Sequence, residues 1–286
     1  MGRSASDKPD HTFPVADRHG TEPHVLDVIP PDRIARLVED VGVRKVGLSL
    51  LQTLTLGILA GAFIAFGSMF FTVTVTGSEL GYGPTRLLGG MAFSLGLALV
   101  IIGGAELFTG NSLIVMAWAS RRITTRALLR NWTIVYAGNL IGALATAVLV
   151  HLSGTLHLAG GEVGQTAGAI AMGKLSLDPI QAFVRGVLCN ILVCLAVWMC
   201  FAARTVSGKI LAIIFPVTAF VALGFEHSIA NMYLLPVAML HMDGKIDAMA
   251  LLANLLPVTA GNVVGGGVLV ALVYWLVYLR PERTVP

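Results

Sequence analysis

The chain has 286 residues, of which 56% are hydrophobic and 12% are charged, and its mean hydropathy is +0.81. Soluble domains carry about twice that share of charged residues, so this composition excludes a soluble protein. The formal net charge of +3 is too small to indicate a nucleic-acid partner. The sequence therefore predicts an all-α integral membrane protein whose immediate partner is the lipid bilayer.

The chain begins with a polar segment that precedes any apolar span. Residues 1–30 contain several prolines and no apolar core, which is typical of a disordered cytoplasmic tail rather than of a signal peptide. Residues 31–46 place Ile34 and Val38 on one helical face, which predicts an amphipathic interfacial helix capped by Asp32. A helix packed on the protein's own cytoplasmic face is an equally good interpretation.

Six apolar segments follow, each long enough for the roughly 20 residues that cross a bilayer as a helix. They are residues 48–71, 87–118, 132–152, 179–203, 210–240 and 248–279. The second and the fifth are too long for one straight span. Each of these two contains a Gly-x-Glu sequence near its middle, so we expect a half-helix, an irregular turn and a second half-helix.

The two interruptions match each other in composition and spacing. Residues 104–111 read GAELFTGN and residues 224–231 read GFEHSIAN, with Gly, Glu and Asn at the same offsets. A carboxylate inside a span is a functional candidate, because it is costly unless it faces a bundle interior or a watery cavity. The residues expected to form the breaks are Gly104, Glu106, Gly110, Asn111 and Gly224.

Each glutamate is expected to brace its break by accepting loop N–H bonds rather than to contact a solute. An unpaired carboxylate in a conduit would repel an anion, and a buried backbone N–H needs an acceptor. The second half-helices are expected to begin after Gly110 and Asn231, where their exposed N–H groups would favour an anion.

Three matches in the same order indicate an internal repeat. The breaks match, Gln-x4-Gly occurs in spans one and four, and Asn-x6-Gly-Asn-x2-Gly occurs in spans three and six. Three spans per half is an odd number, so the halves form an inverted 3+3 repeat. We place the transport domain at 47–282, with repeat one at 47–153 and repeat two at 178–280. Its small-xxx-small glycine pairs are expected to bring helices close together.

Basic residues set the expected orientation. They concentrate before span one, after span two, after span four and after span six, and the positive-inside rule makes these four regions cytoplasmic. The multi-pass chain is then expected to lie in the cell inner membrane with both termini in the cytoplasm. The residues are Arg33, Arg36, Arg44, Lys45, Arg121, Arg122, Arg126, Arg130, Arg204, Lys209, Arg280 and Arg283.

Three stretches carry a resemblance to a known family: GGAELFTGN in span two, GVLCNILVCLA in span four and GFEHSIANMYLLP in span five. In order and position they resemble the signature segments of the formate/nitrite transporter family, nearest to its formate channel-like members. The resemblance covers about residues 30–282. It implies an aquaporin-like protomer with one pore, six helices of which spans two and five are broken, and a homopentamer.

The resemblance also implies site residues. His227 is the central pore histidine, with Glu226 before it and Asn231 in the same turn, and Thr109 faces it from the other break. An amide at Asn190 needs hydrogen-bond partners, so it is expected either to face the pore or to make an interhelical hydrogen bond. The resemblance makes Asn190 the lining asparagine and Lys174 the basic residue at the periplasmic mouth. The implied pore constrictions are Leu97, Phe93, Phe220, Leu107, Phe108 and Val193.

These residues suit a small monovalent anion. A buried carboxylate without compensation is strongly disfavoured, and an imidazolium at His227 can supply a charge or a proton. Lys174 would raise the local anion concentration. Proton transfer from His227 would make transport proton-coupled, and without it the pore is an anion channel.

The leading hypothesis is a channel or transporter for anions of weak acids. Formate is the first candidate, with a nitrite transporter or a hydrosulfide channel as alternatives. A neutral-solute, aquaporin-like pore is the rival of another class, but it would not require His227 or Lys174. No activated nucleophile, zinc spacing or phosphate loop is present, so we expect neither an enzyme nor a metal or cofactor.

Overall fold

The computed structural model describes residues 29–242 and 246–280, and all regular structure in these residues is helical. The predicted tail, apart from its last two residues, lies outside them. In chain order the elements are α1 Pro31–Val46, α2 Leu50–Val75, α3 Tyr82–Gly103, η1 Gly110–Ile114, α4 Val115–Ala119, α5 Thr125–Leu152, η2 Thr155–His157, η3 Ala159–Gly161, α6 Glu162–Leu175, α7 Pro179–Ala202, α8 Val206–Ala222, α9 Ser228–His241, α10 Ala248–Val263, the π-helical η4 Val264–Leu272 and α11 Val273–Tyr278.

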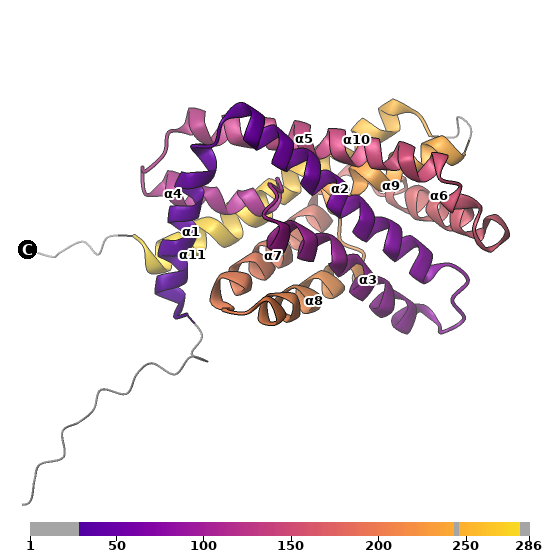
Figure 1. Ribbon diagram of the computed structural model, residues 1–286, viewed down its shortest axis with the longest axis horizontal. Helices are drawn as coiled ribbons and strands as arrows, with labels where there is room; N and C mark the ends of the chain where they lie inside the picture. Colours follow the sequence, from indigo (N-terminus) through magenta and orange to yellow (C-terminus); the bar gives the residue numbers. More distant parts are fainter. Residues whose placement is uncertain (1–28, 243–245, 281–286) are drawn as a thin grey trace, which may run out of the picture.

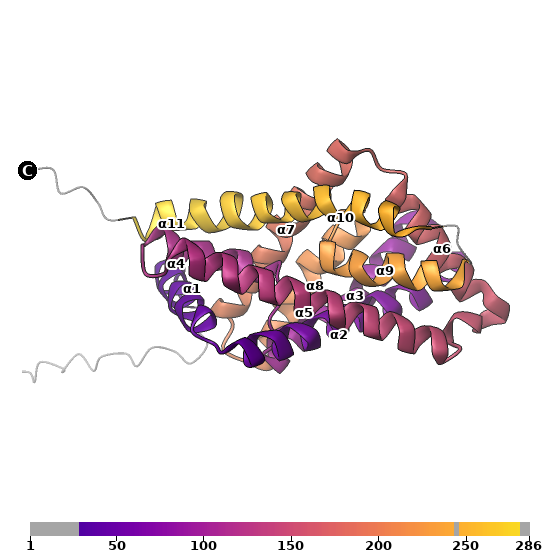
Figure 2. The same ribbon diagram turned by 90° about the horizontal axis from the view of Figure 1, so that it is seen from above.

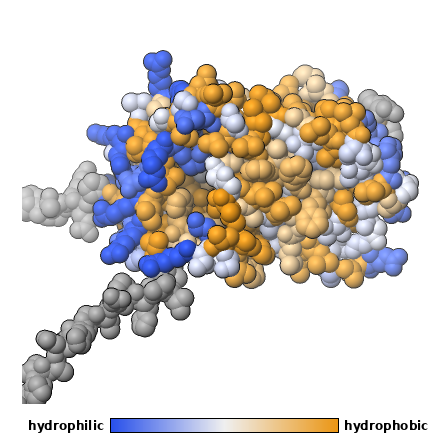
Figure 3. Space-filling model, in the orientation of Figure 1, coloured by the Kyte–Doolittle hydropathy of each residue, from blue (hydrophilic) through white to orange (hydrophobic). Residues whose placement is uncertain are grey.

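The long helices run along the bundle in Figures 1 and 2, and their lengths agree with the predicted spans. Five helical stretches of the described chain are long and apolar enough to cross a membrane: α2, α3, α5, α7 and the continuous helix from α10 to α11. The fifth predicted span is divided between α8 and α9, which are shorter. Figure 3 shows hydrophobic residues across the middle of this face of the molecule, with hydrophilic residues gathered at the α1 end and some at the opposite end.

Helix starts in the structure follow local capping rules. Ser49 and Gln52 form a capping box at the start of α2. Asp178 accepts hydrogen bonds from two N–H groups of α7, whose first residue is Pro179. These caps fix where α2 and α7 begin.

Close packing of α2 on α5 and of α7 on α10 depends on glycine. A Cβ added to Gly61 would collide with the backbone of Asn139, and one added to Gly261 would collide with the backbone of Phe183. The glycines expected from their spacing to bring helices together do so in both halves. The two helix pairs are equivalent elements of the repeat.

Helix α1 packs on the protein itself. Ile34, Ala35 and Val38 are buried against α4 and η1, so the second sequence interpretation describes this helix. The N-cap of α1 is Pro30 without a side-chain cap, and Asp32 lies in the first turn, which corrects the predicted cap. Pro31 at the first helical position needs no N–H partner, so a side-chain cap is less important here.

Helix α6 was not expected from the sequence. Lys45 near the end of α1 and Lys174 near the end of α6 are separated by the same offset as Gln52 and Gln181, so the repeat correspondence extends to these two helices. The segment is short and rich in glycine, and its apolar periodicity is weak, which hides it from pattern analysis. Each half therefore contributes a short helix that carries a lysine to its own break.

Candidate functional site

Both predicted interruptions are present as breaks in the helices. Helix α3 ends before Gly104, whose φ of 73° is left-handed, and α8 is followed by Gly224 with a φ of 70°. This conformation is easy only for glycine, which explains both residues. The second half-helices begin at Gly110 and at Ser228, so Asn231 lies within the first turn of α9 rather than before it, which corrects the predicted start.

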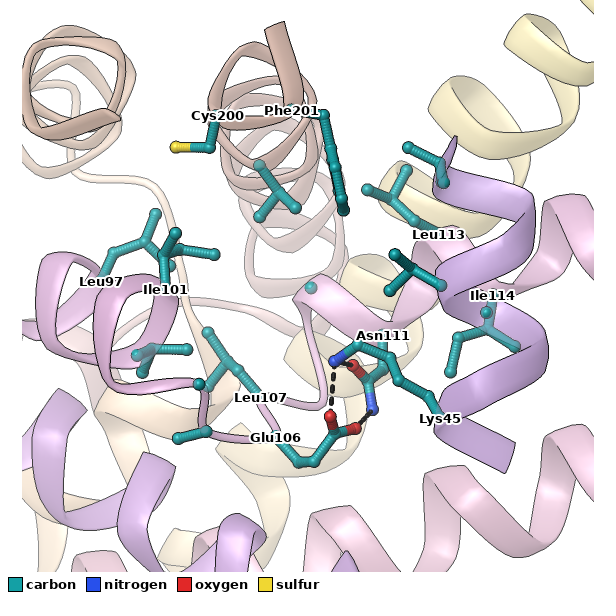
Figure 4. Close-up of a pocket in the computed structure, with 18 of the residues that line it drawn as sticks. Lys45, Leu97, Ile101, Glu106, Leu107, Asn111, Leu113, Ile114, Cys200 and Phe201 are labelled. Carbon is teal, nitrogen blue, oxygen red and sulfur yellow. Dashed lines mark hydrogen bonds and ion pairs between the residues drawn. The ribbon is translucent and has the colours of Figure 1, made fainter. Parts of the chain in front are cut away.

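Glu106 is the centre of a polar cluster at the first break (Figure 4). Its carboxylate accepts hydrogen bonds from Lys45 Nζ at 2.7 Å and from Asn111 Nδ2 at 2.7 Å. Lys45 Nζ also donates to Asn111 Oδ1 at 2.9 Å, and Asn111 Nδ2 donates to Asn131 Oδ1 at 3.0 Å. The glutamate braces the break as predicted, but through side chains of α1, η1 and α5 rather than through loop N–H groups.

Glu226 holds an equivalent cluster at the second break. It accepts hydrogen bonds from Lys174 Nζ at 2.9 Å and from Asn231 Nδ2 at 2.7 Å. Asn231 Nδ2 also donates to Asn254 Oδ1 at 2.8 Å, whereas Asn231 Oδ1 is buried without a partner among the described residues. Lys174 is thus part of the bracing of the second break, in addition to lining a cavity as described below.

One further asparagine at each break holds the backbone there. Asn139 Nδ2 donates to the carbonyls of Gly57 and Glu106, and its Oδ1 accepts from the N–H of Phe108. Asn262 makes the same three bonds in the other half, to Gly186 O, Glu226 O and Ser228 N. Buried irregular backbone needs such partners, and these amides supply them.

Sequence reasoning did not assign these bracing residues to the site. Asn131, Asn139, Asn254 and Asn262 were visible as the Asn-x6-Gly-Asn repeat, but that pattern was read only as evidence of duplication. Lys45 could have been found because it is separated from Lys174 by the same number of residues as the repeated glutamines Gln52 and Gln181. Residues repeated in both halves at a depth where polar groups are costly are bracing candidates.

His227 and Thr109 meet between the two breaks. Thr109 Oγ1 lies 3.0 Å from His227 Nε2, and both side chains are buried. The other ring nitrogen, Nδ1, accepts a hydrogen bond from the N–H of Ala230 at 3.1 Å and thereby caps α9. A neutral imidazole carries one N–H, so in this tautomer the proton is on Nε2 and is donated to Thr109. The threonine hydroxyl hydrogen is then free to be donated to a solute.

Two cavities approach this contact from opposite sides. The α1-side cavity has a volume of about 250 Å³ and is lined by Val38, Lys45, Leu97, Glu106, Leu107 and other residues. The α6-side cavity has a volume of about 460 Å³ and is lined by Phe93, Lys174, Phe220, Glu226, His227 and other residues. Thr109 lines neither cavity, so the Thr109–His227 contact lies where the two are separated.

Most predicted constriction residues lie at this separation. Phe93 and Phe220 contact each other edge to face at 5.5 Å between ring centroids, and Phe220 stacks on the His227 ring at 5.9 Å. Leu97, one turn from Phe93 on α3, lines the other cavity together with Leu107 (Figure 4). Buried apolar rings on either side of a polar pair make a barrier that a hydrated ion crosses only by losing water.

Two predicted constriction residues lie elsewhere. Phe108 packs edge to face on Trp132 and Tyr136 of α5, at 6.0 and 4.9 Å between centroids, and lines neither cavity. Val193 is buried in the apolar core and also lines neither. Leu107 lines a cavity while its neighbour Phe108 packs on α5, so position next to a pore residue does not determine where a side chain points.

Asn190 braces the helices instead of facing either cavity. Its Nδ2 donates to the carbonyl of Thr109 at 3.2 Å, to Ser112 Oγ at 3.1 Å and to the carbonyl of Asn262 at 2.6 Å. Gly266 leaves the space for this amide, since an added Cβ there would collide with it. Of the sequence alternatives, the interhelical hydrogen bond is the one in the structure. Asn190 thus ties the two breaks together beside the Thr109–His227 contact.

Among the described residues, no group of three His, Cys, Asp or Glu side chains could hold a metal ion. The chemistry available at the junction is therefore hydrogen-bond donation by Thr109 and His227, with the breaks held rigid by ion pairs. This arrangement can present donors to a small polar solute between two apolar layers.

Comparison with known proteins gives a family and several relatives. A family model described as "Formate/nitrite transporter" matches residues 32–276. The chain is 41% identical over 274 residues to "Formate channel FocA" of Escherichia coli (strain K12), with 89% of this chain and 96% of that protein covered.

Solved structures give the same result. One described as "Pentameric formate channel with formate bound" is 43% identical and has a TM-score of 0.76. The match covers 81% of this chain and 98% of that one. Another, described as "FNT family ion channel", is 29% identical and has a TM-score of 0.79. This match covers 86% of this chain and 98% of that one.

Proposed function

Because the chain belongs to the formate/nitrite transporter family, we propose that it carries formate across a membrane through the two cavities and the junction between them. The relatives' names support formate as the substrate. The observation that carries the proposal is the 3.0 Å contact between Thr109 and His227, one side chain from each break, at the closed separation of the cavities.

The proposed path has three stages. An anion enters a cavity whose walls carry cationic side chains, and it is held there by long-range attraction. It then loses water at the apolar layers, Phe93 and Phe220 on one side and Leu97 and Leu107 on the other. Between these layers the Thr109 hydroxyl, whose oxygen accepts from His227 Nε2–H, replaces the lost water as a donor. Buried polar groups tolerate dehydration only with such replacement.

Proton coupling would require a change at His227. With its proton on Nε2 the neutral ring can donate a hydrogen bond, but transferring that proton would leave an imidazolate. An imidazolium can transfer a proton to formate, but forming it needs a proton on Nδ1, which breaks the bond from Ala230 N–H. We therefore expect proton-coupled passage mainly at acid pH, with hydrogen-bonded passage of the anion at higher pH.

Assembly and orientation are further parts of the proposal. Large apolar side chains such as Phe70, Ile180 and Phe215 are exposed on the isolated chain, as expected for faces that contact lipid or neighbouring copies. We propose a homopentamer with one conduit in each protomer and a transport domain at residues 47–282. The α1 side, with its basic residues, would face the cytoplasm of a cell with this protein in its inner membrane, and both termini would lie there.

Transport by purified protein in liposomes tests the function. Uptake of formate, nitrite and hydrosulfide would be compared with simultaneous current recording from about pH 5 to about pH 8. Saturable formate uptake, with less charge moved per formate at acid pH, is the expected result. Preference for nitrite or hydrosulfide would reassign the substrate, and uptake of neutral solutes alone would overturn anion transport.

A further inference from the structure

The α6-side cavity carries more positive charge than its bracing needs. Its basic lining residues are Arg86, Lys174 and Arg185, and Glu226 is the only acidic one among the described residues. Glu226 is already paired with Lys174 at 2.9 Å. The two arginines form no ion pair within the described chain, so their charges are the uncompensated ones in this cavity.

The two guanidinium groups approach the same point of the second break. Arg86 Nη2, from α3, donates to the carbonyl of Val221, and Arg185 Nη1, from α7, donates to the carbonyl of Gly224 at 3.3 Å. A Cβ built on Gly224 would lie 3.9 Å from Arg86 Nη2 and 3.7 Å from Arg185 Nη1. The two nitrogens are therefore no farther apart than the sum of these distances.

Both groups retain unused hydrogen-bond donors. A guanidinium has five N–H groups, and each arginine uses one of them on a carbonyl of the break. The guanidinium carbon of Arg86 lies 5.5 Å from the centre of the Phe71 ring, so the ring covers a face of the group rather than its N–H edge. Two neighbouring cations with spare donors repel each other unless an anion lies between them.

Comparison of the repeats argues against a purely structural role for Arg185. The carbonyl of Arg185 accepts from Glu226 N–H at 3.2 Å, and the carbonyl of Leu56 accepts from Glu106 N–H at 3.1 Å in the other half. The backbone bracing is thus the same, although Leu56 has an apolar side chain. The break in the first half is held without a guanidinium, so the guanidinium is additional to the scaffold.

We propose that Arg86 and Arg185 form a carboxylate-binding subsite in the α6-side cavity, ahead of the Phe93 and Phe220 barrier. This inference rests on the proposed function, since it names where the substrate is held before dehydration. The planar guanidinium fork matches the two oxygens of a carboxylate, and a charge-assisted pair is stronger than a neutral hydrogen bond. A cavity of about 460 Å³ has room for a carboxylate much larger than formate.

The test uses terephthalate, an aromatic dicarboxylate too wide for the closed junction, as a probe of the subsite. Formate uptake into liposomes is measured with terephthalate on both sides of the membrane, so that insertion orientation does not matter, and with chloride at equal ionic strength as the reference. In the unmodified protein terephthalate should inhibit competitively. Arg185→Gln and Arg86→Gln should each raise the inhibition constant and the half-saturating formate concentration about tenfold, which is the loss of one strong charge-assisted bond.

Three comparisons keep the result specific. Arg185→Lys retains the charge but not the fork, and should recover only part of the lost affinity. Arg126→Gln removes an exposed arginine of α5 that lines neither cavity, and should change neither constant. The thermal midpoint and the oligomer size of every variant are measured, because Arg86 and Arg185 also contact the break.

The outcomes separate the subsite from the function. Formate uptake with unchanged constants in folded Arg185→Gln and Arg86→Gln would overturn the subsite and leave the function intact. Full recovery by Arg185→Lys would overturn the bidentate fork and leave only a long-range charge effect. If the unmodified protein transports no formate, the function fails, and the subsite is then judged by whether terephthalate raises the thermal midpoint of the unmodified protein but not of the glutamine variants.

Discussion

The two helix breaks have the same bracing but different chemistry at the junction. Glutamate, lysine and three asparagines occupy equivalent places in both, with the glutamate accepting from lysine at 2.7 Å in the first break and at 2.9 Å in the second. Following the glutamate, however, the first break has Leu107 where the second has His227. Thr109 in the first break corresponds to Ile229 in the second.

This difference shows how a duplicated scaffold acquires an asymmetric site. The bracing groups hold irregular backbone in a membrane, a task that both halves share and that constrains both sequences alike. The junction needs one polar pair rather than two. The first half supplies Thr109 and has the apolar Leu107 at the position of the histidine, and the second half supplies His227 and has the apolar Ile229 at the position of the threonine. Leu107 contributes to the apolar layer of the α1-side cavity, while His227 faces the α6-side cavity.

The largest expected effect comes from removing one bracing carboxylate. Glu226→Ala leaves the Lys174 ammonium, whose side chain is 15% exposed, without its partner, which we expect to cost about 3–5 kcal/mol of stability. Glu106→Ala should cost less, because Lys45 is 25% exposed and keeps its bond to Asn111. Thermal unfolding of the two purified variants measures the difference.

A second substitution tests the cause of that loss. Adding Lys174→Met to Glu226→Ala removes the unpaired charge, so the double variant should be more stable than Glu226→Ala alone. Equal stability of Glu226→Ala and the unmodified protein, or no recovery in the double variant, would show that the ion pair does not brace the break.

The next largest effect sharpens the equivalence of the halves. Asn139→Ala and Asn262→Ala each leave one N–H and one carbonyl of the break without a partner, and each should cost about 2–3 kcal/mol. Because the three bonds are the same, the two losses should agree to within about 0.5 kcal/mol. Thermal unfolding measures both. A large loss in one half only would mean that the halves do not share a scaffold.

Replacing His227 separates its capping role from its place at the junction. His227→Asn keeps a good N-cap for the N–H of Ala230 but removes the contact with Thr109, so the fold should remain while formate uptake falls about tenfold and loses its pH dependence. His227→Leu makes the second break resemble the first and should also lose about 1 kcal/mol of stability with the cap. Uptake with an unchanged pH profile in His227→Asn would exclude the histidine as the titrating group.

The sequence predicted the spans and both breaks, because apolar length, glycine and buried polar residues leave strong linear signals. The pairing of Thr109 with His227 was expected only from the family resemblance. The sequence did not predict helix α6, since a short glycine-rich helix between two spans has no clear apolar period. Phe108 and Val193 were predicted at the constriction but line neither cavity. For Asn190, a place in the pore lining was one of two predicted alternatives, and the structure has the other. Phe108 leaves an irregular loop, whereas Val193 and Asn190 lie on α7. The surroundings of all three depend on tertiary contacts, and that of Phe108 also on loop backbone angles, which spacing does not record.

The smallest expected effect concerns the helices that carry the two lysines. Helix α1 is held at its outer surface by Arg122, which donates to Asp40 at 2.6 Å and to Glu39 at 3.0 Å, whereas α6 has no corresponding cluster among the described residues. Arg122 is 41% exposed, so Arg122→Gln should cost less than about 1 kcal/mol. Amide hydrogen exchange measures the effect: exchange in α1 should be faster in Arg122→Gln, and exchange in α6 should be unchanged. Arg126→Gln, which removes an exposed arginine without an ion pair in the described chain, is the control.

The pH and salt dependence of this contact follow from its exposure. The hydrogen bonds that Arg122 donates to Asp40 and Glu39 raise the pKa of its guanidinium above the ordinary value. A raised pKa of a base adds stability that is fully present below the ordinary value and is lost only as the pH rises through the raised one. Arg122 therefore stays protonated between about pH 6 and pH 9, and the protection that this contact gives to the α1 amides should not change in that range. High salt screens exposed ion pairs and should make exchange in α1 faster. Identical α1 exchange in Arg122→Gln and Arg126→Gln would mean that α1 is held beside the first break by its apolar packing and by Lys45, without a contribution from Arg122.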